Sequence, residues 1–387
     1  MVDTKKDRDR SPELGEEGRG SQTSCECGPE CCGWTSDKAK EASYFREAGH
    51  WIERRIESPV GEIPVVRTRF SRQDILGKVK ARFGFGRMNY KVRPGLYAVG
   101  NAAPGSPVLV SANYKLSFDS LRRELAGLDA WILVLDTKGI NVWCAAGKGT
   151  FGTEELVRRI EDTVLSRVVS HRVLILPQLG APGVASHAIT RQTHFKVIYG
   201  PVRAADVKNF LAAGMKATPE MRRVKFGLRE RFVLTAIELT NPFKYLVIVT
   251  AVLWILSLLG LHLLSWKAWY PYLGAILIGG FLVPVLLPWI PGRAFAWKGW
   301  LLGMLWAGFV NIHQGLLPPA PNTWQLAAVH FLLLPAISAF LAMGFTGSST
   351  YTSLSGVLKE MRYAVPVILA SASVGIVFLA VVLIRAL

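Results

Sequence analysis

Five long apolar runs restrict the C-terminal part of the chain to a membrane domain. Each run is long enough to cross the hydrocarbon core of a bilayer as a helix. A large buried helical core is the alternative, but five such runs with almost no charge exceed what a soluble domain of this size covers. Trp and Tyr gather at their ends, as is typical of a membrane–water interface. The runs are Phe243–Leu264, Tyr270–Ile290, Gly299–Leu317, Trp324–Phe345 and Tyr363–Ile384.

Basic residues that flank these runs predict the orientation of the domain. The loops of one side hold more Lys and Arg than those of the other, and the linker 216–242 is also basic. Because basic loops stay in the cytoplasm, we expect a multi-pass protein of the cytoplasmic (inner) membrane, with Leu387 outside. The polar side chains of His313, Gln314 and His330 are expected to hydrogen-bond between helices rather than to line a path for solute.

Residues 43–215 alternate strand-like apolar runs with amphipathic helix-like runs, the pattern of an α/β domain. The best-marked helix begins at Thr153, the expected N-cap, and two acids follow it. We therefore expect a Rossmann-like domain, followed over 243–387 by an all-α transmembrane domain of five helices. The expected strands are Gly95–Val99, Pro107–Ala112, Ala130–Leu135, Val173–Leu176 and Phe195–Tyr199, and the expected helices are Ser71–Arg82, Ser117–Leu125, Thr153–Val169 and Ala204–Ala212.

Three segments that contain Gly or Asn follow expected strands. Ligands of such sheets bind at the C-terminal ends of the strands, and glycine lets the backbone approach a ligand closely. Ordinary loops have the same composition, and the phosphate-loop spacing Gly-x-x-x-x-Gly-Lys is absent. The segments are Ser111–Tyr114, Asn141–Gly152 and Gln178–Gly183.

The second of these segments contains a thiol. It begins Asn141-Val142-Trp143-Cys144-Ala145-Ala146-Gly147-Lys148, and Cys144 is the only cysteine after Gly33. A buried, inert core cysteine is the simplest interpretation, since free Cys is among the most buried residue types. Lys148 fits a surface or ligand-side cation better than a catalytic base.

The eight-residue stretch resembles the signature of the mercury-methylating corrinoid protein family. Residues 136–212 also resemble, more distantly, the corrinoid-binding domain of the corrinoid iron–sulfur protein of acetyl-CoA synthesis. In that relative a threonine occupies the position of Cys144, and its helix covers the lower face of the corrin ring. With a membrane domain following, the resemblance extends from about Ser43 to Leu387. It implies that Cys144 is the catalytic residue and cobalt ligand, and the expected corrinoid contacts are Asn141, Val142, Trp143, Cys144, Ala145, Ala146, Gly147, Lys148, Asn113, Gly180 and Gly183.

The activity that the resemblance implies is methyl transfer from a base-off corrinoid of the cobalamin type to Hg(II), which gives methylmercury. Hg(II) is an electrophile, so the methyl group has to leave cobalt with electrons, as a carbanion or radical equivalent. A thiolate is an anionic, strongly donating axial ligand and favours that mode. A membrane-bound corrinoid or methyl carrier without mercury chemistry is the alternative, although it would not need Cys144.

Two further partners follow from this chemistry. No cysteine run matches an iron–sulfur cluster, so an external electron donor is needed. The resemblance suggests a small ferredoxin with two 4Fe–4S clusters. Methyl groups would come from a methyltetrahydrofolate-linked donor of anaerobic one-carbon metabolism.

Residues 1–42 have too little apolar surface to fold and are predicted to be a disordered tail without a signal peptide. The α/β domain is then expected in the cytoplasm, where thiols stay reduced. The tail cysteines do not have zinc-site spacing, but thiols bind soft cations, so a Hg(II) relay is one interpretation. A tail whose cysteines have no role, or a thiol–metal protein without a corrinoid, are the others. The four are Cys25, Cys27, Cys31 and Cys32.

Positive charge is concentrated in the middle of the chain. The net charge is +17, and most of it lies between the tail and the apolar runs. Such a charge suggests a cytoplasmic face near anionic lipid, or an anionic ligand. Nucleic acid is not expected, because no recognition motif with interleaved aromatics is present.

Overall fold

The computed structural model describes residues 49–258, 266–318, 323–348, 351 and 354–386. The predicted tail with its four cysteines lies outside the described residues.

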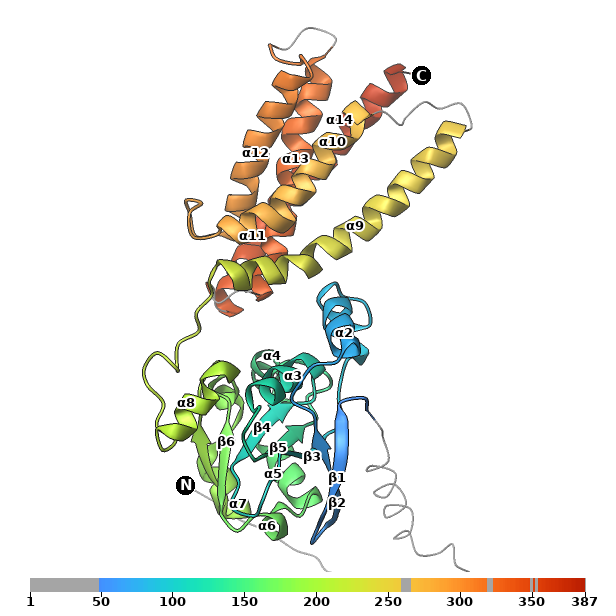
Figure 1. Cartoon of the computed structure of the whole chain (residues 1–387). Coiled ribbons are helices and arrows are strands. Elements are labelled where there is room, and N and C mark those ends of the chain that lie inside the picture. Colours follow the sequence, from blue (N-terminus) through green and yellow to red (C-terminus); the bar gives the residue numbers. More distant parts are fainter. Residues whose placement is uncertain (1–48, 259–265, 319–322, 349–350, 352–353, 387) are drawn as a thin grey trace, which may run out of the picture. The chain divides into compact units, whose positions relative to one another are not determined.

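One seven-stranded mixed sheet forms the centre of the N-terminal domain (Figure 1). Its order is β1-β2-β3-β5-β4-β6-β7. β4 to β7 run parallel, whereas β3 pairs with β5 antiparallel and β1 pairs with β2 as an antiparallel hairpin. The expected α/β class is confirmed, with a mixed sheet. The strands are β1 (Ile52–Ser58), β2 (Gly61–Val66), β3 (Gly95–Val99), β4 (Val108–Ala112), β5 (Ala130–Leu135), β6 (Val173–Leu176) and β7 (Lys196–Tyr199).

Both faces of the sheet are covered, so the central strands are apolar throughout. All residues of β4 and β5 are buried, as expected for strands with helices on both faces. One core joins the sheet to α4, α5, α6 and α7, and the other joins it to α3 and α8. The helices of this domain are α2 (Arg72–Arg82), α3 (Lys115–Glu124), α4 (Val142–Gly147), α5 (Thr153–Asp162), α6 (Leu165–Val168), α7 (Ser186–Thr193) and α8 (Val207–Ala212), with short 3₁₀ turns η1 (Arg87–Asn89), η2 (Gln178–Gly183) and η3 (Ala204–Asp206).

The single helix predicted over Thr153–Val169 is two helices. Val164 adopts a left-handed φ of 44° between α5 and α6. The apolar periodicity continues across this break because both helices pack into the same core. The predicted N-cap was also wrong. Gly152 is the N-cap, and the hydroxyl of Thr153 instead accepts a hydrogen bond from the amide of Ala185 at 2.9 Å.

Three elements were not predicted from the sequence. The β1–β2 hairpin lies at the edge of the sheet, and its first strand is largely exposed and charged, so it lacks a clear apolar run. Helix α7 was missed because only Ile189 is fully buried. Helix α4 was assigned to a loop on composition, although the resemblance implied a helix there. Its six residues are too few for a periodic signal.

The C-terminal region is helical. Three of its described helical segments are long and apolar enough to cross a membrane: Lys267–Leu286, Trp324–Gly347 and Ser355–Arg385. The count of five spans is not confirmed and stays a prediction. The helix before them starts at Leu228, inside the linker predicted over 216–242. The helices are α9 (Leu228–Leu258), α10 (Trp266–Leu277), a π-helical turn η4 (Ile278–Leu282), α11 (Val283–Leu286), α12 (Phe295–His313), α13 (Trp324–Gly344) and α14 (Leu354–Ala386), with a 3₁₀ turn η5 (Phe345–Ser348).

Polar side chains in these helices hydrogen-bond to neighbouring helices, as predicted. Nδ1 of His330 on α13 lies 2.7 Å from Oδ1 of Asn311 on α12. His313 and the hydroxyl of Tyr270 are 2.9 Å apart, and the amide of Gln314 donates to the carbonyl of Lys267 at 2.7 Å. Such contacts pair polar groups between neighbouring helices.

Candidate functional site

The C-terminal ends of the parallel strands meet at a point where the chain reverses direction across the sheet. From β4 the chain adds β5 on one side, and then passes to the other side for β6 and β7. The crossovers change faces accordingly, since α3 and α8 cover one face and α4 to α7 the other. In open α/β sheets such a switch point, here between β4 and β6, is where ligands bind.

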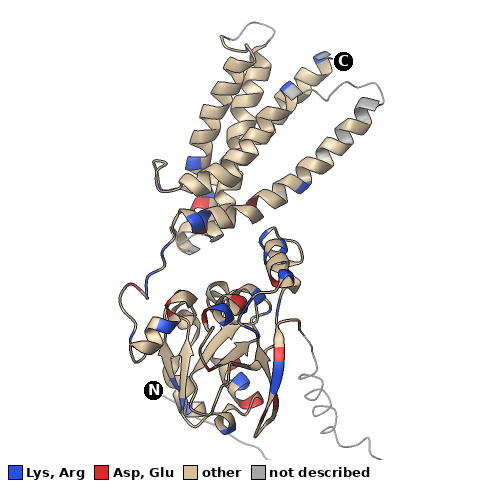
Figure 2. Cartoon of the chain, viewed as in Figure 1, with Lys and Arg blue, Asp and Glu red and all other residues tan. Residues whose placement is uncertain are grey.

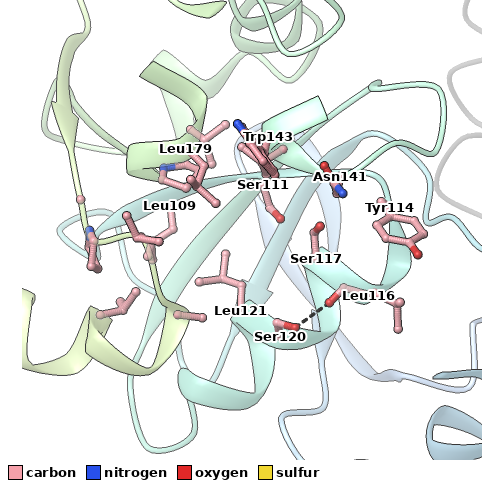
Figure 3. A pocket seen from close by; sticks show the side chains of 18 of the residues that line it. Leu109, Ser111, Tyr114, Leu116, Ser117, Ser120, Leu121, Asn141, Trp143 and Leu179 are labelled. Carbon is pink, nitrogen blue, oxygen red and sulfur yellow. Dashed lines mark hydrogen bonds between the residues drawn. The ribbon is translucent and has the colours of Figure 1, made fainter. Parts of the chain in front are cut away.

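A pocket of about 390 Å³ opens at this point (Figure 3). Its volume falls within the range of small-molecule sites. The wall is mostly apolar, with hydroxyl groups from β4 and α3 and the first residues of the α4 segment. The lining residues include Ser111, Ser117, Tyr114, Asn141, Trp143 and Leu179.

Helix α4 presents the predicted thiol. Its N-cap is Asn141, whose side-chain oxygen accepts a hydrogen bond from the amide of Cys144 at 2.8 Å. Val142 and the two alanines of the helix are buried in the domain core. Trp143 is 40% exposed, and Cys144 is half-buried and carries a free thiol. Cys144 is therefore neither a fully buried core residue nor part of a disulfide.

Close packing against two glycines holds α4 in place. A Cβ atom on Gly183 would lie 2.2 Å from the carbonyl oxygen of Phe151 and 3.0 Å from Cα of Ala146. A Cβ atom on Gly180 would lie 2.4 Å from the ring of Phe151, which is fully buried. Both glycines thus support α4 from η2. A corrinoid contact by either one stays a prediction.

Asn113 fixes the loop that leads into α4. Its side-chain oxygen accepts hydrogen bonds from the amide and hydroxyl of Thr137 at 3.1 and 2.8 Å, and from the amide of Gly139 at 3.0 Å. Its nitrogen donates to Asp136 at 3.0 Å. The side chain is 2% exposed and faces the protein. The structure therefore gives Asn113 a positioning role, and a direct ligand contact remains a prediction.

Asp136 starts the same loop as an ionised group. Burial alone would raise the pKa of this carboxyl, but hydrogen bonds from the side chain and amide of Lys138 and from Asn113 lower the pKa below its usual value. The ionised carboxylate of Asp136 stabilises the left-handed turn at Lys138, where φ is 58°. This turn fixes the direction in which the chain reaches Asn141, the N-cap of α4.

Tyr114 is buried beside the pocket with an unused hydroxyl. The residue is 4% exposed, and its oxygen has no hydrogen-bond partner among the described residues. Burial raises the pKa of Tyr114, and the nearby charge of Cys144 acts in the same direction, while Arg87 and Arg82 oppose it. Both arginines line the pocket. Sequence reasoning missed them because they lie on α2 and η1, away from the strand ends.

The predicted site residues do not all lie on one surface. Asn141, Val142 and Trp143 line the pocket, whereas Cys144 lies next to them but outside its wall. Gly147 and Lys148 are exposed at the far end of α4. Among the described residues, no group of three or more His, Cys, Asp or Glu side chains forms a metal site.

Comparisons with known proteins match the sheet domain. Residues 72–211 match the family described as CO dehydrogenase/acetyl-CoA synthase delta subunit. The acetyl-CoA decarbonylase/synthase complex subunit gamma of Archaeoglobus fulgidus is 32% identical over 127 residues, which are 32% of this chain and 27% of the relative. The subunit gamma of Methanopyrus kandleri is 33% identical over 123 residues, 31% of this chain and 26% of the relative.

A third relative bears on the cofactor. The corrinoid/iron–sulfur protein large subunit of Moorella thermoacetica is 28% identical over 127 residues, 32% of this chain and 28% of the relative. The chain thus spans about a quarter of the length of these curated relatives. The sheet domain is therefore similar to the CO dehydrogenase/acetyl-CoA synthase delta subunit family, to gamma subunits of acetyl-CoA decarbonylase/synthase complexes and to the large subunit of a corrinoid/iron–sulfur protein.

Proposed function

We propose that this protein transfers a methyl group from a corrinoid to Hg(II) and that the Cys144 thiolate is the lower axial cobalt ligand. One observation carries the proposal: a free, half-buried thiol stands on a capped helix at the switch point of a domain similar to corrinoid proteins. A core cysteine would be fully buried. The same helix is the one that the sequence resemblance assigns to the lower face of a corrin ring.

The residues around Cys144 fit a corrinoid. The pocket wall combines apolar surface with the hydroxyls of Ser111 and Ser117, which suits a macrocycle that carries amide side chains. The buried hydroxyl of Tyr114 has no partner among the described residues, and a ligand amide or phosphate would supply one. Arg82 and Arg87 would bind the phosphate of a base-off nucleotide loop.

A bound corrinoid supplies a cobalt ion that carries a methyl group. The chain contributes the remaining parts. Cys144 offers an anionic sulfur donor, which coordination to metal keeps deprotonated, and axial-ligand identity is the main protein control over such an ion. Asn141 and the packing of α4 fix the direction of that donor. Trp143, the residue before it, is exposed and would offer apolar surface to the corrin ring.

The cellular setting is part of the same proposal. We infer a multi-pass protein of the cytoplasmic membrane with the sheet domain in the cytoplasm, served by a ferredoxin-like donor with two 4Fe–4S clusters and by a methyltetrahydrofolate-linked methyl donor. Hg(II)–thiol complexes would be the substrate. Reporter fusions at Leu387 and in the loop between α11 and α12 should give opposite locations. The same location from both would contradict the five-span arrangement.

The test is methylmercury formation by the purified full chain from Hg(II) and a methylated corrinoid. Wild type should form methylmercury, and its visible spectrum should indicate a thiolate-ligated cobalt. Cys144→Ala should reduce formation to background while the fold and membrane insertion remain. A chain in which all four tail cysteines are Ser is the matched control, since it loses thiols but keeps Cys144. Substantial activity in Cys144→Ala would refute the ligand assignment.

A methyl carrier without mercury chemistry is the second candidate. The relatives favour it, because their names place them in acetyl-CoA decarbonylase/synthase complexes. A carrier would bind corrinoid and pass methyl groups to a nucleophile, and it would leave Hg(II) unchanged. Corrinoid binding by both wild type and Cys144→Ala, with no methylmercury from either, would select this function.

A further inference from the structure

Helix α2 has an apolar face that points away from the domain. Ile75, Leu76, Val79 and Phe83 are 54, 55, 45 and 45% exposed. Their spacing places them on one side of a helix, and Phe85 and Met88 continue the surface at 58 and 65% exposure. Monomeric soluble proteins rarely leave such a contiguous patch uncovered. We call these six residues the α2 face.

Buried charges on the opposite side prevent α2 from turning this face inward. Asp74 is 1% exposed and forms ion pairs with Lys115 at 3.1 Å and Arg122 at 2.8 Å, and it lies 2.9 Å from His50. Its carboxylate also closes a capping box with Ser71. Rotation of the helix would break the Asp74 ion pairs and leave the buried cations Lys115 and Arg122 with Asp119 as their shared counter-charge, at a cost of several kcal/mol. The ion pairs of Asp74 therefore keep the α2 face exposed.

Basic residues border the α2 face. Arg72 and Lys80 are exposed at its edges, and Figure 2 shows Lys and Arg along this helix. Lys80 also lines a shallow groove with Val79, Phe83 and Phe85. Exposed apolar side chains bordered by basic residues suit contact with an anionic bilayer surface.

We propose that the α2 face inserts into the headgroup region of an anionic membrane. Residues 213–227 connect α8 to α9, so the sheet domain stays within roughly 50 Å of the helical region. The proposal rests on the helical region lying in a bilayer and is independent of methyl transfer. An anionic lipid surface fits both the apolar area and the bordering charge, whereas a neutral surface fits only the first. Arg82 and Arg87 of the same segment line the pocket, so the inserted element also forms a wall of the site.

Photo-crosslinking of the full chain in vesicles tests the contact. A benzophenone amino acid replaces Leu76 in one variant and Gln192, an exposed residue of α7, in the matched control. Vesicles are pure phosphatidylcholine or an equimolar mixture with phosphatidylglycerol. We expect lipid adducts at Leu76, more in the anionic vesicles, and few at Gln192. Equal lipid adducts at the two positions, or adducts to α9 or to a soluble protein in place of lipid, would overturn the proposal.

A charge reversal tests the lipid preference separately. Arg72→Glu/Lys80→Glu, combined with the probe at Leu76, should lose the preference for phosphatidylglycerol, since each basic residue near an anionic surface contributes about fivefold in affinity. Arg191→Glu/Lys196→Glu is the control, because both residues are exposed on α7 and β7. Thermal unfolding should be the same in both double variants. An unchanged lipid preference in Arg72→Glu/Lys80→Glu would refute the electrostatic part.

Discussion

Helices α2 and α4 both follow a capping side chain, yet different interactions hold them on the sheet domain. Ser71 caps α2 through a capping box, and the Asp74 ion pairs hold that helix from below. Asn141 caps α4, which has six residues and packs on Gly180 and Gly183. Both helices expose their functional surface: α2 an apolar face, and α4 a thiol beside Trp143.

The comparison shows that a helix too short to be stable alone can still place a side chain accurately. Isolated helices of this length are unstable, so surrounding contacts determine where α4 lies. A substitution in a close-packed contact lowers stability gradually, because the neighbouring residues can shift by tenths of an ångström. Loss of Asp74 from the buried ion cluster lowers stability more steeply, since it leaves two buried cations, Lys115 and Arg122, with Asp119 as their shared counter-charge.

The largest expected effect comes from replacing the Cys144 thiol while the packing of α4 on the sheet domain stays unchanged. Cys144→Thr puts a residue of similar size at a half-buried site, and the sequence resemblance implies Thr at this position in the corrinoid iron–sulfur protein. We expect corrinoid binding to persist and methylmercury formation to fall to background, because a hydroxyl is not an anionic donor at neutral pH. A corrinoid-binding titration and the methylation assay on the same preparation measure the two effects. Wild-type methylation by Cys144→Thr would show that the thiolate is dispensable.

Next in size is the loss of the charge that holds α2. Asp74→Ala removes one of the two carboxylates that pair with Lys115 and Arg122, which are 2 and 0% exposed, and leaves Asp119 alone to balance both cations. The free energy of unfolding should therefore drop by about 3–5 kcal/mol. Glu62→Ala is the matched control, since the Glu62 side chain is 61% exposed and its pair with Arg55 spans 3.4 Å. That pair should contribute less than about 1 kcal/mol. Denaturant unfolding of the two variants compares them, and similar losses would contradict a special role for the buried cluster.

Low pH should weaken the ion pairs by which Asp74 holds α2 on the sheet domain. Burial alone would raise the pKa of Asp74, but the hydrogen bond to Ser71 and the charges of Lys115 and Arg122 lower it well below its usual value. A lowered folded-state pKa adds stability above the unfolded value of about 3.9 and loses it as pH falls further. Unfolding measured between neutral pH and pH ~3 should show this loss in wild type. Asp74→Ala should lack this component, and an identical acid response in both would exclude Asp74 as its source.

Sequence reasoning found the parts of the fold that carry strong periodic or compositional signals. The strands from β3 to β7 are mostly apolar, with Ser111 in β4 and Lys196 in β7 as exceptions, so their positions followed from the pattern. The β1–β2 hairpin did not, because its exposed charged strand lacks that pattern. The antiparallel pairing of β3 with β5 leaves no sequence signature, because both strands are apolar in either direction.

The candidate site was predictable only in part for a similar reason. The thiol segment stands out by composition, and Asn141 to Trp143 do line the pocket. The hydrogen bonds of Asn113 and the packing of Gly183 against Ala146 join segments far apart in the chain. A pattern of neighbouring residues in the sequence cannot distinguish residues that support the site in this way from residues that contact a ligand. Arg82 and Arg87 reach the pocket from α2 and η1, where no sequence pattern indicates a site.

A smaller effect should follow from disturbing the packing beneath α4. Gly183→Ala places a methyl group 2.2 Å from the Phe151 carbonyl, so α4 or η2 must shift, at about 1–3 kcal/mol. Gly105→Ala is the matched control, because Gly105 is not among the expected corrinoid contacts and a Cβ there meets nothing within 4 Å. We expect Gly183→Ala to weaken corrinoid binding and Gly105→Ala to keep it. Equal affinity in both variants would show that the position of α4 does not depend on this contact.

The smallest effect concerns the tail cysteines, which would supply the thiol of α4 with substrate. Hg(II) is a soft cation that moves between neighbouring thiolates without a redox step, and about 40 residues of unfolded chain have an r.m.s. span on the order of 35 Å. Free Hg(II)–thiol complexes can also reach the site, so the relay would aid the reaction without being required. Ser at Cys25, Cys27, Cys31 and Cys32 together should lower the methylation rate when Hg(II) is limiting and matter little when it is plentiful. A variant that matches wild type at every Hg(II) concentration would leave these thiols without a part in the reaction, and Cys144 as the one cysteine that it needs.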